Sequence, residues 1–259
     1  MDKQNINFNL VYGTHKMTNG IMHGIKYGAI DTATGYNNAD DLNKLIGKSI
    51  KAPCIITKFN QKDFDMGIED VANNHILELG SNPKIVLIHS TLRTHNENLS
   101  AFKELKNLFP NILIGVSNFD LVQIKFLVDN GYVPDVIQLE YHPLFQPNKL
   151  VEYCKENGII IMAYRPFAKG DLLKNPTILE LSNKYKVIPS HLILKWLHHK
   201  NIIPVVSSNR KENIESNKKF YKIYVDESAF NELDNMNLGL EGSTCMIKFC
   251  KMDGEIPIL

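Results

Sequence analysis

The chain has 259 residues, which suits one large domain or two small ones, and its 44% hydrophobic and 22% charged residues are typical of a protein with a full apolar core. Its 29 Lys and Arg side chains balance 28 Asp and Glu side chains for a net charge of +1, so no strong field is available to hold nucleic acid or an anionic membrane. The N-terminus lacks the apolar stretch of a signal peptide, and the longest apolar run, Ile159 to Ala163, is too short to span a bilayer, so we expect a cytoplasmic protein.

Short apolar or β-branched runs recur along the chain, and each ends abruptly in a polar residue. Eight such runs occur, ending at Thr14, Asp31, Lys58, His89, Ser117, Gln138, Tyr164 and Ser207. Their apolar residues are continuous rather than alternating, which is typical of parallel strands that are buried on both faces. Most gaps between the runs are long enough for one crossover helix with its turns. The pattern therefore predicts eight strand–helix units.

The segments between the runs are predicted to be helices. Their apolar residues recur at helical spacing, and Asp, Pro and Gly stand at positions typical of helix ends. The clearest predicted helices cover residues 42–50, 68–79, Asp120 to Gly131, Pro147 to Gly158, 178–184 and 189–200. Eight such units are the number that closes into a barrel, and no linker-like segment interrupts them. We therefore predict an α/β fold, a single-domain (β/α)8 TIM barrel over residues 1–259.

Polar residues at the ends of consecutive runs indicate where chemistry could occur. The active sites of such barrels lie at the carboxyl ends of the strands, so these residues should face one mouth. Asp31, Lys58 and His89 end three consecutive runs, and Tyr36 follows in the loop after Asp31. A lone Asp or Lys at a strand end is usually part of a rim ion pair, and a lone His is usually structural. Titratable groups at four linked positions instead favour a catalytic cluster.

Six motifs carry a resemblance to a known family. IDTATGY, ITK, LIHS, IGVSNF, IQLEYHP and AYRPF, in this order, resemble those of the aldo-keto reductase superfamily, and the similarity runs from Leu10 to Asn217. The resemblance implies a catalytic tetrad of Asp31, Tyr36, Lys58 and His89. It also implies an NADPH-dependent oxidoreductase, in which a hydride passes from the nicotinamide to the carbonyl carbon of an aldehyde or ketone while a proton is delivered to the oxygen.

The physical properties of the implied tetrad agree with this chemistry. A free tyrosine has a pKa of about 10, so a phenol that donates a proton near neutrality benefits from an adjacent cation, which stabilises the tyrosinate. Lys58 supplies that cation, and Asp31 pairs with Lys58 to fix its position. His89 can donate a hydrogen bond to the carbonyl oxygen. We expect Tyr36 to be the proton donor and no metal to be required.

The resemblance also implies how a nicotinamide cofactor is held. Ser117, Asn118 and Gln138 resemble the residues that bind the carboxamide, and Tyr164 resembles the aromatic residue that stacks on the nicotinamide ring. Thr14 is expected beside the ribose and phosphates. The chain has no GxGxxG motif, so the barrel itself, rather than a Rossmann module, is expected to hold the cofactor.

The segment VVSSNRKENIESN, at the end of the last run, departs from the family pattern. Where the family commonly has a Lys-Ser pair followed by an Arg, this chain has Ser207, Ser208 and later Asn213. Arg210, with Lys211 beside it, is expected to contact a 2′-phosphate, so NADPH is favoured and NADH is the alternative. The other possibility is that both are solvated residues at a helix start. The remaining expected cofactor residues are Arg165, at the pyrophosphate, Phe167, and Asn217, near the adenine.

Three positions indicate the nature of the substrate pocket. Many aldehyde-reducing members of the family carry tryptophan at them, whereas this chain has His15, Asn60 and Ser90. Smaller polar groups in place of indoles predict a wider, wetter pocket that favours hydroxylated or dicarbonyl compounds over flat aromatic aldehydes. The large residues that could refill this space are Phe59, Leu92, Met246 and Phe249.

Two other functions remain open at this point. One is a nicotinamide-binding regulatory subunit with little turnover, and the other is a Schiff-base aldolase that uses Lys58 as nucleophile. The intact tetrad argues against the first, and pairing with Asp31 favours a charged, unreactive lysine over the second. The 4 cysteines are expected to be reduced thiols, and no His or Cys spacing suggests a metal site. A small carbonyl substrate is the expected partner, and the sequence leaves the oligomeric state open.

Overall fold

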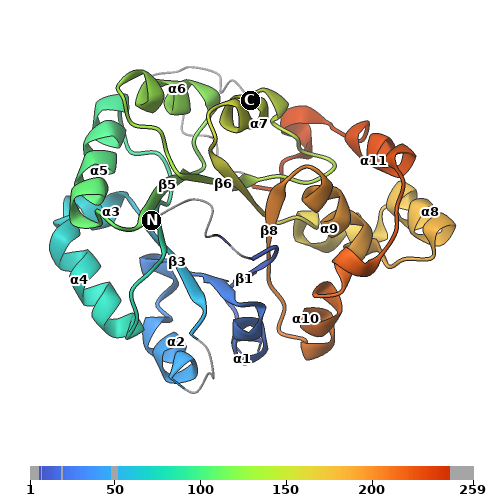
Figure 1. The fold of residues 1–259 in the computed structure, drawn as a ribbon, viewed down its shortest axis with the longest axis horizontal. Helices are drawn as coiled ribbons and strands as arrows, with labels where there is room; N and C mark the ends of the chain where they lie inside the picture. The colour runs from blue at the N-terminus through green and yellow to red at the C-terminus, as the bar shows by residue number, and fades with distance from the viewer. Residues whose placement is uncertain (1–5, 7, 19, 48–51, 246–259) are drawn as a thin grey trace.

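The predicted strands form a closed parallel barrel in the computed structural model, which describes residues 6, 8–18, 20–47 and 52–245 (Figure 1). Strands that are consecutive along the chain are neighbours in the barrel, and the last strand pairs with the first. The strands are β1 (Val11–Gly13), β2 (Ala29–Asp31), β3 (Cys54–Phe59), β4 (Ile85–Ile88), β5 (Leu113–Ser117), β6 (Val136–Glu140), β7 (Ile160–Tyr164) and β8 (Ile202–Val206). The predicted (β/α)8 TIM barrel is confirmed.

Helices surround the barrel on its outside (Figure 1). The longer ones are α2 (Ala39–Ile46), α4 (Ile68–Leu79), α5 (His95–Leu108), α6 (Leu121–Asp129), α7 (Asn148–Glu156), α8 (Pro176–Tyr185), α9 (Pro189–His199), α10 (Lys211–Asn217) and α11 (Glu227–Asp234). Two are short, α1 (Ile21–Gly24) and α3 (Gln61–Asp65), and 3₁₀ turns cover Ile25–Tyr27, Thr34–Tyr36, Ala168–Lys174, Phe220–Lys222 and Gly239–Gly242. None of the helices within the described ranges is long and apolar enough to cross a lipid bilayer.

The helix ends agree closely with the cap residues expected from the sequence. Asp120 caps α6, and its carboxylate accepts a hydrogen bond from the Gln123 backbone N–H at 2.9 Å. Gly80 ends α4 in the left-handed conformation, with a φ of 62°. The helix expected over 42–50 instead begins at Ala39 and ends at Ile46, and positions 48–50 lie outside the described residues.

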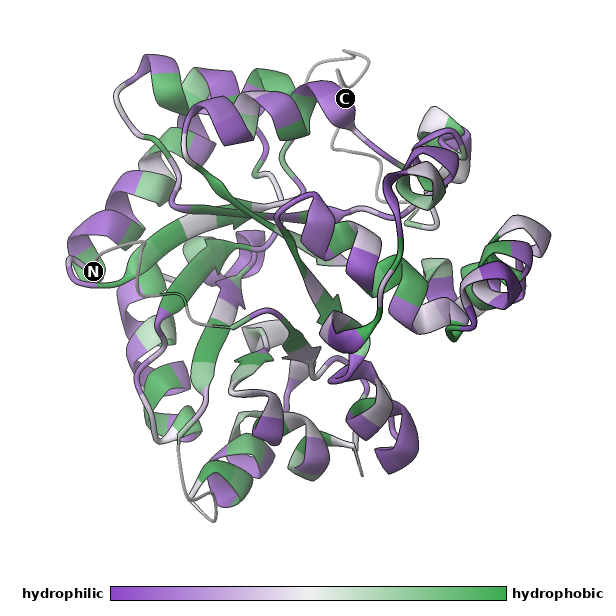
Figure 2. Cartoon of the chain, turned by 45° about the vertical axis from the view of Figure 1, so that its right-hand side comes forward, coloured by the Kyte–Doolittle hydropathy of each residue, from purple (hydrophilic) through white to green (hydrophobic). Residues whose placement is uncertain are grey.

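Apolar residues fill both the barrel and the layer between strands and helices. Figure 2 shows the central strands almost uniformly hydrophobic, while the surrounding helices alternate between hydrophobic and hydrophilic residues. One buried cluster has members from every strand, among them Ile56, Leu87 and Met162, and it forms the core inside the barrel. Outside the strands, Trp196 on α9 is fully buried and stacks on Tyr141 with ring centroids 5.4 Å apart. The packed core holds the barrel rigid, so the residues at the ends of the strands can form a functional site without contributing to the core.

Candidate active site

A cavity of about 510 Å³ opens at the carboxyl ends of the strands. It gathers residues that are far apart in the sequence, from the loop after β1 to the last described residue. The sequence-predicted residues that line it are His15, Asp31, Tyr36, Asn60, His89, Ser117, Asn118, Gln138, Tyr164, Arg165 and Ser207. The closed barrel brings them together because all of them lie in or follow parallel strands whose carboxyl ends meet at one mouth.

Asp31 lines this cavity, and Lys58, which does not line it, forms a buried ion pair with Asp31. The Lys58 Nζ donates to Asp31 Oδ1 at 2.5 Å and to the Thr32 carbonyl oxygen at 2.9 Å, and the two charged side chains are only 1% and 5% exposed. Gln138 Nε2 donates to the other carboxylate oxygen of Asp31 at 2.7 Å. Burial opposes the charge on Lys58, but Asp31 and then Tyr36 outweigh it and raise the lysine pKa. The lysine therefore stays an ammonium ion.

The Tyr36 ring lies between this ammonium ion and two imidazoles. Lys58 Nζ is 5.1 Å from the ring centroid, His15 stacks on the ring at 4.7 Å between centroids, and His89 meets it edge-on at 5.8 Å. Burial raises the Tyr36 pKa above its ordinary value of 10.0 by more than Lys58 lowers it. The Lys58 ammonium ion thus does not bring the Tyr36 pKa toward neutrality, because the loss of hydration destabilises the phenolate by more than the ammonium ion stabilises it. Tyr36 is a protonated phenol.

His89 stands beside the tyrosine as a neutral imidazole. Burial, with the nearby charges of Lys58 and His15 as smaller causes, lowers the His89 pKa to about 3. A neutral imidazole carries one ring N–H, so it can donate a single hydrogen bond to an oxygen in the cavity. Its backbone is held as well, because Asn118 Nδ2 donates to the His89 carbonyl oxygen at 2.9 Å.

The ends of β5 and β7 supply a connected polar wall opposite the tyrosine. Asn118, directly after β5, adopts a left-handed φ of 61°, a conformation in which Asn is enriched among residues other than glycine. Its Nδ2 also donates to Ser117 Oγ at 3.1 Å, and the Tyr164 hydroxyl donates to its Oδ1 at 2.6 Å. Three residues predicted from two motifs, IGVSNF and AYRPF, therefore form one hydrogen-bonded unit.

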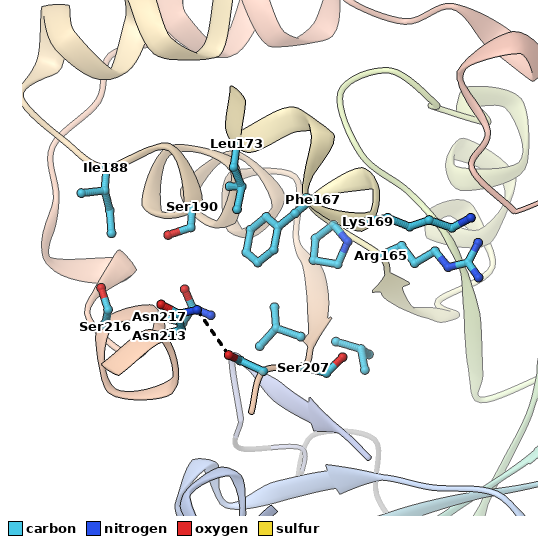
Figure 3. Close-up of a pocket in the computed structure, with 15 residues that line it drawn as sticks. Arg165, Phe167, Lys169, Leu173, Ile188, Ser190, Ser207, Asn213, Ser216 and Asn217 are labelled. Carbon is cyan, nitrogen blue, oxygen red and sulfur yellow. Dashed lines mark hydrogen bonds between the residues drawn. The ribbon is translucent and has the colours of Figure 1, made fainter. Parts of the chain in front are cut away.

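A second cavity of about 440 Å³ adjoins the first and shares Arg165, Val205 and Ser207 with it. Figure 3 shows its two ends, with Ser216, Asn213 and Asn217 together at one end and the side chains of Arg165 and Lys169 extending away at the other. Phe167 lies between them, and Asn213 Nδ2 donates to Ser208 Oγ at 3.3 Å. The two cavities form an elongated site that runs from Tyr36 to α10.

Comparison with known proteins decides the family. The profile of the aldo/keto reductase family matches residues 17–238, most of the chain. This chain is a member of the aldo/keto reductase family. It is 36% identical over 129 residues to aldehyde reductase YPR1 of Saccharomyces cerevisiae, an alignment that covers 48% of this chain and 41% of the yeast protein. It is 26% identical over 233 residues to the uncharacterized oxidoreductase YtbE of Bacillus subtilis, covering 85% of this chain and 82% of that protein.

Solved aldo-keto reductases have the same fold. The crystal structure of MGS-M4, an aldo-keto reductase from a Medee basin deep-sea metagenome library, superposes with a TM-score of 0.82 at 26% identity and covers 91% of this chain and 94% of that one. The structure of silkworm (Bombyx mori) AKR2E5 complexed with NADPH superposes with a TM-score of 0.79 at 22% identity and covers 91% of this chain and 86% of that one. At 22% identity, the second similarity shows the fold alone.

Some residues expected in the cofactor site of this aldo/keto reductase lie away from both cavities. Arg210, the cap residue of α10, and Lys211, its first residue, are both exposed, and neither lines either of the two cavities. The Arg210 backbone N–H nevertheless donates to Ser208 Oγ at 3.1 Å, beside the wall. Thr14 is fully buried, and its hydroxyl is used within the protein, donating to the Asp31 carbonyl oxygen at 2.9 Å.

Of the residues expected around the substrate, some line the catalytic cavity and others do not. His15 and Asn60 line the catalytic cavity, whereas Ser90 does not. The side-chain oxygen of Asn60 is already used within the protein, because Oδ1 caps α3 by accepting a hydrogen bond from the Lys62 backbone N–H at 2.9 Å. Phe59 and Leu92 are buried and line neither cavity, so they do not refill the space. The other two refilling candidates, Met246 and Phe249, lie outside the described residues.

The sequence analysis did not assign four of the residues that line the catalytic cavity, Gly13, Gly35, Val205 and Cys245, and only Cys245 among them carries a reactive side chain. Cys245 is buried against the mouth and lines the cavity next to Tyr164. It was expected only as a reduced thiol, and it is free, as are Cys54 and Cys154, while Cys250 lies outside the described residues. No strand precedes it, so no motif could reveal its position. Within the described parts of the chain, no three His, Cys, Asp or Glu side chains gather as a metal site would require.

Proposed function

We propose that this chain is an NADPH-dependent reductase of aldehydes and ketones in which Tyr36 is the proton donor. The observation that carries the proposal is a protonated phenol in a cavity, placed between the buried Lys58–Asp31 pair and the neutral imidazole of His89. A proton donor, a cation to stabilise the resulting anion and a neutral hydrogen-bond donor are the groups that carbonyl reduction requires.

The residues of the elongated site fit a nicotinamide dinucleotide. Ser117, Asn118 and Gln138 offer amide and hydroxyl groups for the carboxamide, and Tyr164 offers an aromatic face. Arg165 lies where the two cavities meet and provides a cation for the pyrophosphate. The ribose and adenine would lie toward the hydroxyl and amide groups of Ser208, Ser216 and Asn217. When bound, the reduced nicotinamide supplies the hydride.

The tetrad residues then handle the proton. Tyr36 gives its hydroxyl proton to the carbonyl oxygen, and His89 donates a hydrogen bond that orients the same oxygen. The tyrosinate that remains is stabilised by the ammonium group of Lys58 at its side. Asp31 cannot move toward the substrate, because Lys58 and Gln138 hold its two oxygens, so its role is to position the lysine.

NADPH is the proposed donor because a long cationic side chain stands beside the α10 end of the site. Arg210 is exposed, and its backbone is bonded to Ser208, which lines the cavity. A guanidinium can swing onto a 2′-phosphate and bind it with two parallel hydrogen bonds. The remaining walls at this end are uncharged, so NADH is the alternative donor.

The two competing functions are weakened by particular observations. A Schiff-base aldolase needs a neutral lysine, whereas the environment of Lys58 raises its pKa. A regulatory subunit without turnover has no need of a buried ion pair aimed at a protonated tyrosine. The pair would cost stability if it served no reaction, because buried charges rarely stabilise a fold better than apolar residues do.

The deciding experiment is an assay of the purified chain with a panel of aldehydes, ketones and dicarbonyls, each with NADPH and with NADH. We expect loss of reduced-nicotinamide absorbance with at least one aldehyde, faster with NADPH at low cofactor concentration. Cofactor binding without turnover of any carbonyl would support the regulatory subunit. Trapping of a substrate on Lys58 by borohydride would support the aldolase.

A further inference from the structure

The segment that ends the described chain is attached to the loop after β6. We call residues 237–245 the strap. The Leu238 backbone N–H donates to the Leu144 carbonyl oxygen at 3.0 Å, and the Gln146 backbone N–H donates to Asn237 Oδ1 at 3.0 Å. Gly242 lies so close that a Cβ there would be 1.7 Å from the Leu144 carbonyl oxygen. These hydrogen bonds and this close packing therefore attach the strap firmly to the loop after β6.

Glu140, the last residue of β6, holds the far end of the strap. Its Oε1 accepts from the Thr244 backbone N–H at 2.9 Å and from Thr244 Oγ1 at 2.5 Å, and its Oε2 accepts from Ser243 Oγ at 2.6 Å and the Cys245 backbone N–H at 3.0 Å. The residue is 1% exposed. Burial opposes its charge, but hydrogen bonds from His142 and these strap residues lower its pKa to about 2. One carboxylate thus pins three successive residues.

The pinned residues reach the catalytic cavity. Cys245 lines its wall, as Tyr164 does, and the nearby thiol contributes, after burial, to the raised pKa of Tyr164. Thr244 Oγ1 accepts a hydrogen bond from Arg165 Nη1 at 3.4 Å, next to the junction of the two cavities. If the strap were released, the cavity would lose the wall formed by Cys245, and Arg165 would lose its hydrogen-bond partner Thr244.

We propose that Glu140 is a positioning residue that acts through the strap, holding Cys245 as one wall of the substrate cavity and so setting substrate affinity. The inference rests on the proposed function for the identity of that cavity. In a closed ring of eight strands, β6 and β7 lie across from β2 and β3, which carry Asp31 and Lys58. Loosening the strap should therefore weaken substrate binding and leave the proton-transfer groups in place.

The chain contains a chemical reporter for the strap itself. Alkylation of the full-length protein without cofactor, followed by peptide mapping, gives a separate rate for each thiol. In Glu140→Gln, a side-chain NH₂ group replaces one of the two acceptor oxygens. It then faces the N–H and O–H donors of the strap, with which it cannot form the original hydrogen bonds. Loss of charge-assisted hydrogen bonds should raise the Cys245 alkylation rate at least about tenfold. Cys154, fully buried on α7, is the internal control and should keep its wild-type rate. An unchanged Cys245 rate overturns the proposal.

Two further variants keep the test decisive if Glu140→Gln unfolds. Thr244→Val keeps the shape of the side chain and removes only the hydroxyl on the strap side, so Cys245 should label several-fold faster with Cys154 unchanged; no increase contradicts the proposal. Glu140→Asp keeps the charge and should label more slowly than Glu140→Gln. Equal rates in the Asp and Gln variants would show that the carboxylate charge does not hold the strap.

Steady-state kinetics separates a positioning role from a catalytic one. For Glu140→Gln we expect a rise of about tenfold in KM for the carbonyl substrate with kcat within about twofold of wild type. A fall in kcat at unchanged KM overturns the inference, because it would place Glu140 in the chemical step. If the wild-type chain reduces no carbonyl compound, the proposed function fails, while the alkylation rates still decide whether Glu140 holds the strap.

Discussion

The two ends of the elongated site are built in opposite ways. Around Lys58 and Asp31 the charges are buried and each has fixed partners within 3 Å. At the α10 end the walls are uncharged, Ser208 and Asn213 bond to each other, and the nearby cation Arg210 is exposed (Figure 3). A buried charge that its partners hold in place can stabilise a transition state without any rearrangement of the surrounding groups. An exposed charge is screened by water and salt, so Arg210 should confer only a preference for one cofactor over the other. Changes at the first end should therefore have far larger effects.

The largest effect is expected when the proton donor is removed. Tyr36→Phe keeps the ring that packs between His15 and His89 and removes only the hydroxyl. Loss of a general acid should lower kcat/KM for a good aldehyde by at least ~10²-fold, with cofactor affinity retained. Steady-state rates and a fluorescence titration with NADPH measure the two quantities. Reduction at the wild-type rate by this variant would rule out Tyr36 as the donor.

The pH dependence of the wild-type enzyme tests the same assignment independently. Tyr36 must be protonated to donate, and its pKa lies above 10.0, so reduction should fall only at pH values above 10. His89 has a pKa of about 3 and should remain neutral throughout, which predicts no change of rate near pH 6.5 from this residue. A rate that halves between pH 7 and 8 would contradict both statements.

The next largest effect concerns stability at the same end. Asp31→Asn leaves the Lys58 ammonium ion buried without its counter-charge, and breaking one side of a buried pair costs about 3–5 kcal/mol of folding free energy. The matched control is the double variant Asp31→Asn with Lys58→Met, which removes both charges and should be more stable than the single variant. Urea unfolding measures both. A single variant as stable as the wild type would show that the pair is not held as tightly as its geometry indicates.

The same contrast explains how far the sequence alone leads. The strands were predictable because their continuous apolar runs end at polar residues, and the closed barrel then brings Asp31, Tyr36, Lys58 and His89 together. Parallel strands of a barrel present their carboxyl ends to one mouth, so position in the motif translates directly into position in space. The confirmed fold therefore brings Asp31, Tyr36 and His89 to one cavity, with Lys58 buried behind them and paired with Asp31.

What could not be predicted depends on contacts between distant segments. Cys245 lines the cavity, and its backbone N–H donates to Glu140, a residue 105 positions earlier in the chain. The high Tyr36 pKa comes from burial by neighbours that no motif describes. Arg210 is close in the sequence to the position where the family commonly has an Arg, yet it is the cap residue of α10 and is exposed to solvent. Exposed side chains and long-range contacts leave no periodic signal in a sequence.

A smaller effect is expected at the α10 end. Arg210→Ala should weaken NADPH binding by about tenfold, the value of one charge-assisted contact, and leave NADH binding unchanged. Lys211→Ala is the matched control, because it removes an equal charge one residue further along an exposed helix start. Fluorescence titration with both cofactors gives the four affinities. Equal NADPH and NADH affinities in the wild type would mean that this end has lost phosphate selectivity altogether.

The smallest expected effect is on substrate choice. His15 stacks on Tyr36 and lines the cavity, so its ring nitrogens are polar groups close to the proposed proton donor. His15→Phe keeps the stacked ring and removes those nitrogens, which should lower kcat/KM for a short sugar aldehyde by about fivefold relative to benzaldehyde, since one hydrogen bond contributes about 1 kcal/mol. Ser90→Ala is the control, because Ser90 lines neither cavity and its loss should leave the ratio unchanged. A wild-type preference for benzaldehyde, or a ratio that His15→Phe does not move, would show that the polar groups at the mouth do not select the substrate.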